Sequence, residues 1–376
     1  MKIVMVSMPT LHFFRWSSQL KDAGHEVYWF DITGMSTPVA KINWVTQYVD
    51  WKLKWNYPGR SFLKKKFPRV YNYLQQWNEK DTAKEFEKYI KEIQPDVVHS
   101  FALYVSCAPI IGVMEKYKNL KWIYSSWGSD LFFFQNESTY LKDIKRVLPR
   151  VNYLFTDCKR DYIIAKEYGF TGEFLGVFPG GGGFDLEIME SYKKPIKDRN
   201  TILIKGFQGR SGRAIPVLKA VESLQKELID YTIVVFGADV ALFDYLKTSM
   251  IVNWSNVKII GKIPHDEVLR LMGEALIYMG NSNSDGMPNT LLEAICMGAF
   301  PIQSNPGNVT AEIIQDGING FLIEDCEAVF EIENVIKKAI KRTDFENIQR
   351  INYSTIAQQI DFNFVKEKVN QTYLKV

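Results

Sequence analysis

Short apolar runs recur along the first half of the chain, with polar or helical segments between them. The runs are rich in β-branched and aromatic residues and read "KIVMVSM", "EVYWFDI", "DVVHSFA", "KWIYSSW", "NYLFTDC" and "EFLGVFP". Strand-like runs that alternate with helical segments are typical of a parallel sheet covered by helices. The pattern therefore predicts a first α/β domain over residues 1–185.

The same alternation begins again after a break. A polar, charged segment follows "FPGGGGFD", and six further runs come after it: "TILIKGF", "YTIVVFGA", "VKIIGKI", "LIYMGNS", "FPIQSN" and "GFLIE". We predict a linker over residues 186–200 and a second α/β domain over residues 201–355. The segment from about residue 344 to 376 contains no strand-like run and has a helical pattern.

Composition sets the class of protein. The chain has 376 residues, of which 46% are hydrophobic and 24% charged, as in an ordinary globular protein of about two domains. Its four cysteines form no C-x-x-C pair, so neither a disulfide framework nor a zinc site is indicated. No secretory leader and no apolar run long enough to span a bilayer is apparent. We expect a cytoplasmic protein, and a net charge of +3 does not by itself indicate nucleic acid.

Basic charge is concentrated in residues 51–78, which contain no Asp or Glu. Cationic and aromatic side chains alternate there, a mixture that suits the headgroup layer of an anionic membrane. One alternative is a solvated face whose aromatic side chains belong to the core. Single-stranded nucleic acid could bind the same mixture, but we expect no nucleic-acid partner. The residues are Lys52, Lys54, Arg60, Lys64, Lys65, Lys66 and Arg69 with Trp51, Trp55, Tyr57, Phe62, Phe67, Tyr71, Tyr73 and Trp77.

Ligands of open α/β sheets bind beyond the carboxyl ends of the strands, which directs attention to the turns that follow the predicted strands. The turn "KGFQGRSGRA" comes after the first strand of the second domain. Its glycines allow close backbone approach, and its cations suit phosphate oxygens, so it is a candidate diphosphate cradle. It fits neither the G-x-G-x-x-G nor the Walker spacing, and the alternative is a purely structural turn. The candidate residues are Lys205, Gly206, Gly209, Arg210 and Arg213.

A second turn, "FPGGGGFD", has four consecutive glycines. Such a run costs conformational entropy on folding and brings no side chain to pack. Either a ligand approaches the backbone here, which makes Gly181 and Gly182 candidates for donor binding, or the segment is an interdomain hinge.

A third turn opens "SDGMPNTLLEAICMGAFPI" and places Asp285 eight residues before Glu293. Pro288 suits the first position of a helix, and Glu293 then lies inside an apolar helix, where a carboxylate needs a partner. The functional interpretation is that the loop and Asp285 hold a polyhydroxylated ligand while Glu293 accepts hydrogen bonds from a ribose. In the structural alternative, Asp285 caps the loop and Glu293 points to solvent. The remaining candidates of this turn are Gly286, Met287 and Asn289.

The extended segment "SDGMPNTLLEAICMGAFPIQSNPGNVTAEIIQDGINGFLIE" resembles the signature of the retaining, nucleotide-sugar-dependent glycosyltransferases of family 4 (group 1). The resemblance implies the GT-B fold, in which two Rossmann-like domains face a central cleft, and here it implies that a C-terminal helix over 356–376 returns to the first domain. In that family the first acid contacts the transferred sugar and the second holds the ribose. The matching positions are Asp285, Glu293, Glu312, Asp316, Gly317, Asn319 and Gly320, and Asp285 replaces the usual glutamate.

The resemblance extends more loosely to the first domain. "SSWGSDLFF" is similar to the family's "HG-D" segment, which faces the donor sugar and the acceptor, and Asp130 falls on its aspartate. Trp127 stands where many members have histidine, and Gly128 follows it. His99 and Arg15 complete the candidate acceptor side, although His99 is equally well explained as a hydrogen-bonded core histidine.

Two other segments bear on the donor side. "VFPGGGGFD" is similar to the "PNGVD" that ends the family's first domain. In "GFQGRSGRA", Phe207 takes the place of the family's arginine, so Arg210 and Arg213 are the candidates for the two positive charges. Such charges would stabilise the leaving diphosphate most strongly at the transition state.

No metal or cofactor is expected, because the chain has no H-E-x-x-H motif, no cysteine cluster and no D-x-D site. The co-substrate would be a UDP- or GDP-sugar. The resemblance implies a retaining transferase that moves a sugar to a glycan or lipid-linked glycan in surface polysaccharide or glycoprotein glycan biosynthesis. The basic aromatic stretch over residues 51–78 alone suggests a peripheral position at the inner membrane face. The alternatives are a catalytically silent GT-B scaffold that binds nucleotide sugar or a partner enzyme and, more distantly, a sugar-nucleotide epimerase.

Overall fold

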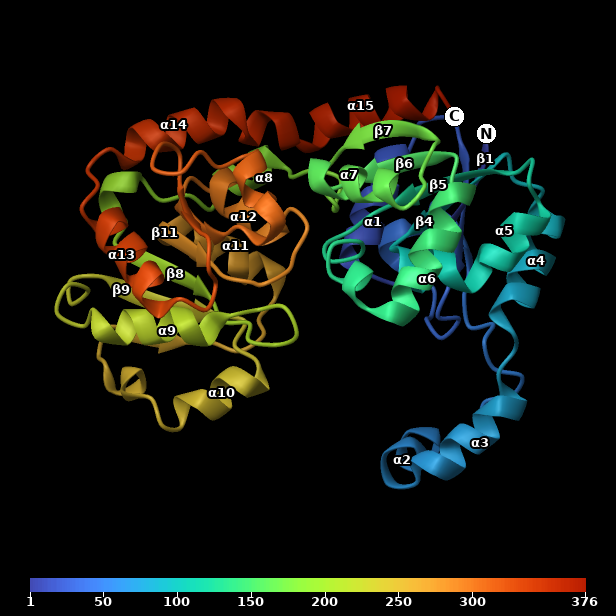
Figure 1. Cartoon of the computed structure of the whole chain (residues 1–376), viewed down its shortest axis with the longest axis horizontal. Coiled ribbons are helices and arrows are strands. Elements are labelled where there is room, and N and C mark those ends of the chain that lie inside the picture. Colours follow the sequence, from blue (N-terminus) through green and yellow to red (C-terminus); the bar gives the residue numbers. More distant parts are fainter. The chain divides into compact units, whose positions relative to one another are not determined.

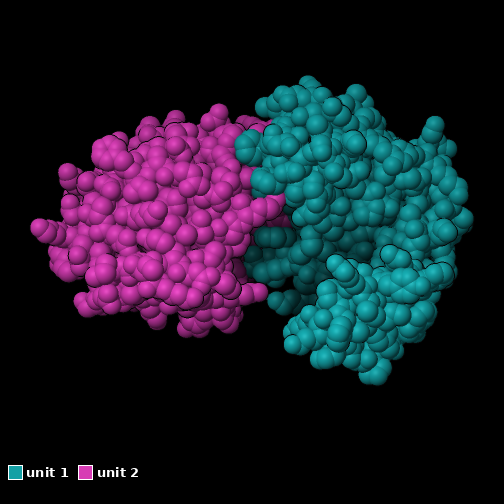
Figure 2. Space-filling model, turned by 60° about the horizontal axis from the view of Figure 1, so that its bottom comes forward, with its two compact units in different colours: residues 1–156, 162–177, 368–376 teal, residues 157–161, 178–367 magenta.

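The computed structural model describes residues 1–376, and the chain divides into two compact units (Figure 2). Unit 1 comprises Met1–Thr156, Tyr162–Val177 and Lys368–Val376. Unit 2 comprises Asp157–Asp161 and Phe178–Glu367. Each unit is built around its own parallel sheet, so the predicted α/β class with two sheets is confirmed.

Unit 1 contains a seven-stranded parallel sheet in the order β3-β2-β1-β4-β5-β6-β7. The six predicted runs all form strands. The additional strand, β3, pairs with β2 at the edge and was not predicted, because its three residues "TQY" carry no apolar run. The strands are β1 (Lys2–Ser7), β2 (Glu26–Asp31), β3 (Thr46–Tyr48), β4 (Val97–Phe101), β5 (Lys121–Ser125), β6 (Tyr153–Thr156) and β7 (Glu173–Val177).

Helices cover this sheet, and a pair of helices extends away from it (Figure 1). Local sequence determines several of their ends. For example, the Asp81 side chain caps α4 by accepting a hydrogen bond of 2.8 Å from the Lys84 N–H. The helices are α1 (Leu11–Ser17), the outlying pair α2 (Arg60–Lys66) and α3 (Pro68–Asn78), α4 (Thr82–Ile93), α5 (Ile111–Lys116), α6 (Ser138–Val147) and α7 (Lys159–Glu167).

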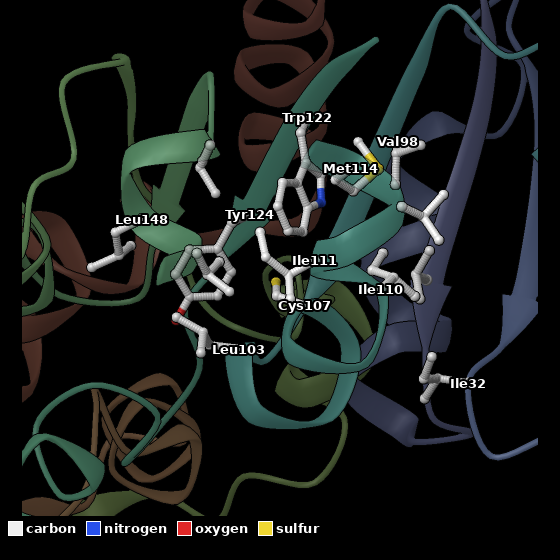
Figure 3. Packing of buried hydrophobic residues seen from close by; sticks show 14 of the residues in the cluster. Ile32, Val98, Leu103, Cys107, Ile110, Ile111, Met114, Trp122, Tyr124 and Leu148 are labelled. Atoms are coloured by element: carbon white, nitrogen blue, oxygen red, sulfur yellow. The ribbon is translucent and has the colours of Figure 1, made fainter. Parts of the chain in front are cut away.

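The core of unit 1 packs against β5, where alternate side chains share one face of the sheet. Trp122 and Tyr124 are fully buried and extend toward the helical segment that carries Leu103, Cys107 and Ile111 (Figure 3). The polar atoms of both rings are satisfied, since the Trp122 indole donates to the Ser100 hydroxyl at 3.0 Å and the Tyr124 hydroxyl donates to a carboxylate. The large rings thus fill the core without leaving buried donors unpaired.

Unit 2 contains a six-stranded parallel sheet in the order β10-β9-β8-β11-β12-β13, and all six predicted runs form its strands. The connections diverge between the two central strands, β8 and β11, which makes this the topological switch point of the sheet. The strands are β8 (Thr201–Lys205), β9 (Thr232–Phe236), β10 (Val257–Ile259), β11 (Ala275–Gly280), β12 (Phe300–Ser304) and β13 (Phe321–Ile323).

The helices of unit 2 cover both faces of its sheet (Figure 1). Helix α12 is buried along almost its whole length, and its "LLEAIC" sequence packs between the sheet and α14. The helices are α8 (Leu186–Glu190), α9 (Ala214–Ser223), α10 (Val240–Leu246), α11 (His265–Glu274), α12 (Asn289–Cys296), α13 (Val329–Ile340) and α14 (Phe345–Thr355).

The C-terminal helix α15 (Phe362–Tyr373) begins in unit 2 and ends in unit 1. The Tyr373 hydroxyl contacts the His99 ring at 2.5 Å, and the Lys121 ammonium donates to the main-chain oxygen of Val376. The predicted linker, residues 186–200, belongs to unit 2 and carries α8. No helix is both long enough and apolar enough to cross a bilayer.

Candidate functional site

The polar residues predicted to bind a donor gather around the switch point of the unit 2 sheet. Lys205 is the last residue of β8, and Gly280 is the last residue of the neighbouring β11. A Cβ atom on Gly280 would lie 2.1 Å from the Gln303 side-chain oxygen, so a larger residue would not fit. The loops that leave these two strands therefore start side by side, at the edge where such sheets bind ligands.

Two of the predicted turns form one structural element. The Arg213 N–H donates to the Asn281 carbonyl and the Asn283 N–H donates to the Ser211 carbonyl, both at 2.9 Å. The Asn281 side chain also donates to the Arg213 carbonyl at 2.9 Å. These three bonds join the turn after β8 to the turn after β11, although about 70 residues separate them. The hydrogen bonds thereby fix the turn that carries Asp285 relative to the turn that carries Arg210 and Arg213.

Asp285 lies in the turn between β11 and α12. Its carboxylate accepts a hydrogen bond of 3.0 Å from the Gly286 N–H, and its side chain remains partly exposed. Desolvation raises the pKa of Asp285, while Lys205, the Gly286 N–H and Arg160 oppose that rise. The carboxylate thus combines a small exposed surface with a nearby lysine, an arrangement able to bind hydroxyl groups of a ligand.

Lys205 directs its ammonium group toward the start of α12, where it donates to the Thr290 hydroxyl at 3.3 Å. The Tyr278 hydroxyl donates to the same threonine at 3.0 Å. The N-terminal turn of a helix attracts negative charge, and a lysine beside it strengthens that attraction. The edge therefore carries a cation, Lys205, close to the Asp285 carboxylate.

Glu293 lies inside α12 and is only 4% exposed. Its carboxylate contacts the His265 ring, with 2.7 Å between Oε1 and Nε2. The alternative that Glu293 points to solvent is therefore wrong. His265, the first residue of α11, is a site residue that sequence reasoning missed, because nothing in the sequence links two helix positions 28 residues apart.

The two predicted arginines differ in their surroundings. The Arg213 guanidinium pairs with Glu327 and donates to the Gly212 carbonyl at 2.7 Å, so its charge is already engaged in holding the loop. Arg210 is exposed on the same loop. A role for either at a diphosphate stays a prediction, and the cations that lower the pKa of Asp285 are instead Lys205 and Arg160.

Gly206 and Gly209 are required by close packing. A Cβ atom on Gly206 would lie 2.8 Å from Val235, and one on Gly209 would lie 2.5 Å from the Phe207 ring. Of the next turn, Gly286, Met287 and Pro288 are buried, whereas Asn289 is partly exposed at the start of α12. The structural explanation of these glycines is sufficient by itself, and their predicted contacts with a donor stay predictions.

Asp157–Asp161 belongs to the site region, although the sequence analysis did not single it out. A Cβ atom on Gly286 would lie 2.3 Å from the Asp157 carboxylate, and Arg160 donates to the Asp285 carbonyl at 2.7 Å. Glu312 in turn accepts hydrogen bonds from the main-chain N–H groups of Lys159 and Arg160, at 2.8 and 3.0 Å. The signal in the sequence was the polar cluster "TDCKRD" directly after a predicted strand.

Asp157, Cys158 and Asp161 offer a set of potential metal-ligating atoms, all within 4.8 Å of one another. Arg160 pairs with Asp161 at 2.9 Å and already supplies positive charge there. Burial raises the pKa of the Cys158 thiol, which disfavours the thiolate that a metal would need. The cluster is a poor cation site, and the expectation of a reaction without metal stays a prediction.

The run of four glycines meets the segment that leads into α15. A Cβ atom on Gly183, whose φ is +94°, would lie 2.9 Å from the Ile360 carbonyl. The Phe184 N–H donates to that carbonyl at 2.9 Å, and the Phe362 N–H donates to the Phe184 carbonyl at 2.8 Å. Close backbone approach thus explains Gly183, while donor contacts by the buried Gly181 and Gly182 stay predictions.

In unit 1, the structure corrects the prediction for His99. This residue lies within β4, is fully buried and contacts Tyr373 at 2.5 Å and Ser125 at 2.7 Å through its two ring nitrogens. Desolvation lowers the pKa of His99 well below its usual value, so the ring is neutral. His99 is a core histidine and has no surface with which to bind an acceptor.

The other candidates of unit 1 are the predicted catalytic residue Asp130 and the predicted acceptor-side residues Trp127, Gly128 and Arg15. Asp130 is 2% exposed, and its carboxylate accepts hydrogen bonds from the Leu103 N–H at 2.6 Å and the Tyr124 hydroxyl at 2.5 Å. Trp127 is partly exposed, and Gly128 beside it has a φ of +59°. Arg15 is partly exposed in the last turn of α1. Their predicted roles stay predictions.

Comparison with known proteins supports the same family as the signature segment. Residues 189–355 match the family "Glycosyl transferases group 1", and residues 77–158 match "Glycosyl transferase 4-like". A curated relative, an uncharacterised glycosyltransferase of Methanocaldococcus jannaschii, is 26% identical over 192 residues, which is 50% of this chain and 45% of the relative. The match thus spans less than half the length of that relative.

Solved structures show the fold. Sucrose-phosphate synthase of Thermosynechococcus elongatus has a TM-score of 0.72 at 14% identity, covering 100% of this chain and 98% of that one. Anabaena Alr3699/HepE, solved with UDP and glucose, has a TM-score of 0.68 at 15% identity and covers both chains fully. The family matches fall on both halves of the chain and support a glycosyltransferase of the group 1 type. The two solved structures show that the chain has the GT-B fold over its entire length.

Proposed function

We propose that this protein transfers a sugar from a nucleotide-diphosphate donor to a glycan acceptor, with retention of anomeric configuration and without a metal. The observation that carries the proposal is the edge between β8 and β11, with Lys205 at the end of β8, Asp285 in the turn after β11 and the buried Glu293 in α12. A diphosphate sugar has complementary parts, since its phosphates are anionic and its sugar and ribose carry hydroxyl groups.

Each group has a defined task in this proposal. Lys205 and the main-chain N–H groups at the start of α12 attract the diphosphate and stabilise the negative charge that develops on it. Asp285 accepts hydrogen bonds from hydroxyls of the transferred sugar. Glu293, oriented by His265 at 2.7 Å, accepts hydrogen bonds from the ribose.

The bond between the anomeric carbon and the phosphate oxygen breaks, and its electron pair leaves with the nucleoside diphosphate. The acceptor oxygen forms a bond to the same face of that carbon, and its proton passes to the departing phosphate. This route needs no protein nucleophile, so Asp285 and Glu293 are not used as the paired carboxylates of a glycosidase.

The donor we propose first is a UDP-sugar, because the structural neighbour from Anabaena was solved with UDP and glucose and, separately, with UDP-glucose. GDP-sugars are the second choice. The acceptor would be a glycan or lipid-linked glycan of surface polysaccharide or glycoprotein biosynthesis, used at the cytoplasmic face of the cell membrane.

Release of nucleoside diphosphate from a panel of UDP-, GDP- and dTDP-sugars tests the proposal, with free and lipid-linked glycans as acceptors. We expect Asp285→Ala to lower turnover and Glu293→Ala mainly to raise the donor KM. Asp230→Asn, an exposed carboxylate of unit 2, is the matched control. Full activity in both variants would contradict the assignment of the site.

A catalytically silent GT-B scaffold is the second candidate. Two features favour a scaffold. Asp285 stands where the family has glutamate, and the Arg213 guanidinium forms an ion pair with Glu327. A scaffold would bind nucleotide sugar tightly and release no nucleoside diphosphate with any acceptor of the panel, whereas the enzyme would release it.

A further inference from the structure

Residues 54–77, which we call the arm, form an outlying part of unit 1 built from α2 and α3 (Figure 1). Helix α2 has no buried residue, and α3 buries only Gln75 and Asn78. The arm therefore contributes almost nothing to the hydrophobic core, and its conformation depends on polar contacts at its base.

The polar side of α3 packs against the segment that leads into α2. The Asn78 side chain donates to the Trp55 carbonyl at 2.9 Å and accepts from the Trp55 N–H at 3.0 Å. The Gln75 side chain donates to the Tyr57 hydroxyl at 3.4 Å. In a helix of a globular domain the apolar stripe faces the core, so α3 is inverted relative to that rule.

The apolar stripe of α3 faces solvent instead. Val70, Tyr73, Leu74 and Trp77 follow the i, i+3, i+4, i+7 spacing of one helix face, and Tyr73 and Trp77 are 63% and 64% exposed. Further rings of the arm extend this apolar surface, with exposed fractions of 61%, 53% and 51%: Phe62, Phe67 and Trp55. A cluster of exposed large apolar side chains of this kind marks an interaction surface.

The charge of the arm has one sign. It contains six cations and no acid, and none of the six forms an ion pair. Lys64, Lys65 and Lys66 are exposed at the end of α2, and the Lys64 ammonium lies 5.9 Å from the Tyr71 ring centroid. The remaining cations of the arm are Lys54, Arg60 and Arg69. The complementary partner is therefore anionic over an extended area.

We propose that the arm docks the protein onto the surface of an anionic lipid bilayer. Tryptophan, tyrosine and phenylalanine rings enter the layer between headgroups and acyl chains, and lysine and arginine side chains contact the lipid phosphates. An acidic protein would match the charge, but a row of outward-facing rings at helical spacing suits a continuous apolar layer. The proposal stands independently of the reaction proposed for unit 2.

Flotation of the full-length protein with vesicles tests it. Vesicles of phosphatidylcholine mixed with phosphatidylglycerol are compared with vesicles of phosphatidylcholine alone. We expect binding to the anionic vesicles only, weakened as salt is added, because exposed charges are screened.

Two sets of substitutions separate the two contributions. Lys64→Gln, Lys65→Gln and Lys66→Gln together should lower the partition coefficient about a hundredfold at low salt, since each cation near the surface contributes about 1 kcal/mol. Tyr73→Ser with Trp77→Ser should lower it at least about tenfold and reduce the vesicle-induced blue shift of tryptophan emission to the part that comes from Trp55.

Matched controls lie in unit 2. The exposed lysines are replaced in the triple variant K219Q/K226Q/K338Q, and the exposed apolar side chains in F330S/M250S. Both controls should bind vesicles as the wild type does. An unchanged thermal unfolding midpoint in the arm variants shows that they are folded, which is expected because the replaced side chains are exposed.

Three outcomes would overturn the proposal. Arm variants that bind anionic vesicles as well as the wild type would remove the arm from the interaction. Concentration-dependent dimers that Tyr73→Ser with Trp77→Ser abolishes, without vesicle binding, would assign the surface to a second copy of the chain. Binding of single-stranded oligonucleotides but not of vesicles would assign it to nucleic acid.

Discussion

The two sheets share one topology, but the side chains at their switch points are charged in unit 2 and aromatic in unit 1. In unit 2, the edge between β8 and β11 carries Lys205 at the end of β8 and Asp285 in the glycine-bearing turn after β11. In unit 1, the corresponding edge between β1 and β4 is filled with aromatic rings. Phe101, at the end of β4, lies 5.4 Å from Phe13 and 4.9 Å from Trp127, measured between ring centroids.

The difference teaches that topology provides the position and the loops provide the chemistry. Both switch points are places where a doubly wound sheet can bind a ligand. Only the one in unit 2 has a cation, a partly exposed carboxylate and glycines that allow close backbone approach. A charged donor suits unit 2, whereas at the edge of unit 1 Phe13 and Phe101 are buried and only Trp127 is partly exposed.

The strongest test of this contrast replaces Lys205 at the edge of unit 2 and, for comparison, Arg15 of α1 in unit 1. We expect Lys205→Ala to lower kcat/KM by about 10²- to 10³-fold, because a positive charge positioned at a developing anion is lost. Arg15→Ala in unit 1 should change the acceptor KM by less than about tenfold. Steady-state kinetics with varied donor and acceptor measure both. Equal losses would remove the distinction between the edges.

A steric test comes next in size. Gly286→Ala would place a Cβ atom 2.3 Å from the Asp157 carboxylate, and the forced shift should cost about 1–3 kcal/mol of unfolding free energy. Gly261→Ala is the control, since its Cβ atom would lie at an ordinary 3.7 Å from the nearest side chain. Urea unfolding curves compare the two variants, and equal midpoints would contradict the prediction.

A smaller effect is expected at the pair that orients Glu293. His265→Ala should raise the donor KM about tenfold with kcat nearly unchanged, because a hydrogen bond to a charged group contributes about 1.5–3 kcal/mol. His265→Gln should restore part of the loss by donating a hydrogen bond. The neighbouring exposed Asp266→Ala is the control. A fall in kcat alone would argue against a positioning role.

The smallest effect concerns the histidine of unit 1. Burial lowers the pKa of His99, so the unfolded chain takes up its proton at a higher pH than the folded chain does. This part of the stability is present above about pH 6.5 and is lost as pH falls below it, by up to about 1.4 kcal/mol per pH unit. We therefore measure the unfolding free energies of the wild type and of His99→Gln from about pH 7 downward. The two curves should diverge as the pH falls. Parallel curves would show that His99 is not responsible.

Much of the fold could be predicted from the sequence, because buried parallel strands read as continuous apolar runs. All six runs predicted for each half form strands. The missed strand β3 has the polar sequence "TQY" and relies on pairing with β2, which no local pattern encodes. The exposure of the apolar stripe of α3 could not be predicted either. Hydrophobic periodicity identifies an apolar helix face, but it does not show whether that face packs against the core or lies in solvent.

The site could be predicted only in part. Asp285 and Glu293 were found because their spacing around a helix start is a local feature. His265 and Arg160 were missed because their contacts with Glu293 and with the Asp285 carbonyl are formed across long sequence separations. For the same reason, the pairing of Arg213 with Glu327 could not be predicted from local sequence, and for His99 the sequence left the core and the acceptor-side interpretations equally open.

The division of α15 between the two units has a consequence for synthesis of the protein. Residues 368–376 complete unit 1, and Tyr373 supplies a partner for His99 inside its sheet. Domains usually fold from the N-terminus onward as they leave the ribosome. Here the unit that emerges first lacks a part of its own structure until residues 368–376 have emerged. Unit 1 of the nascent chain therefore stays incomplete while unit 2 is translated. We expect it to depend on chaperones for longer than an N-terminal domain that folds as soon as it has emerged.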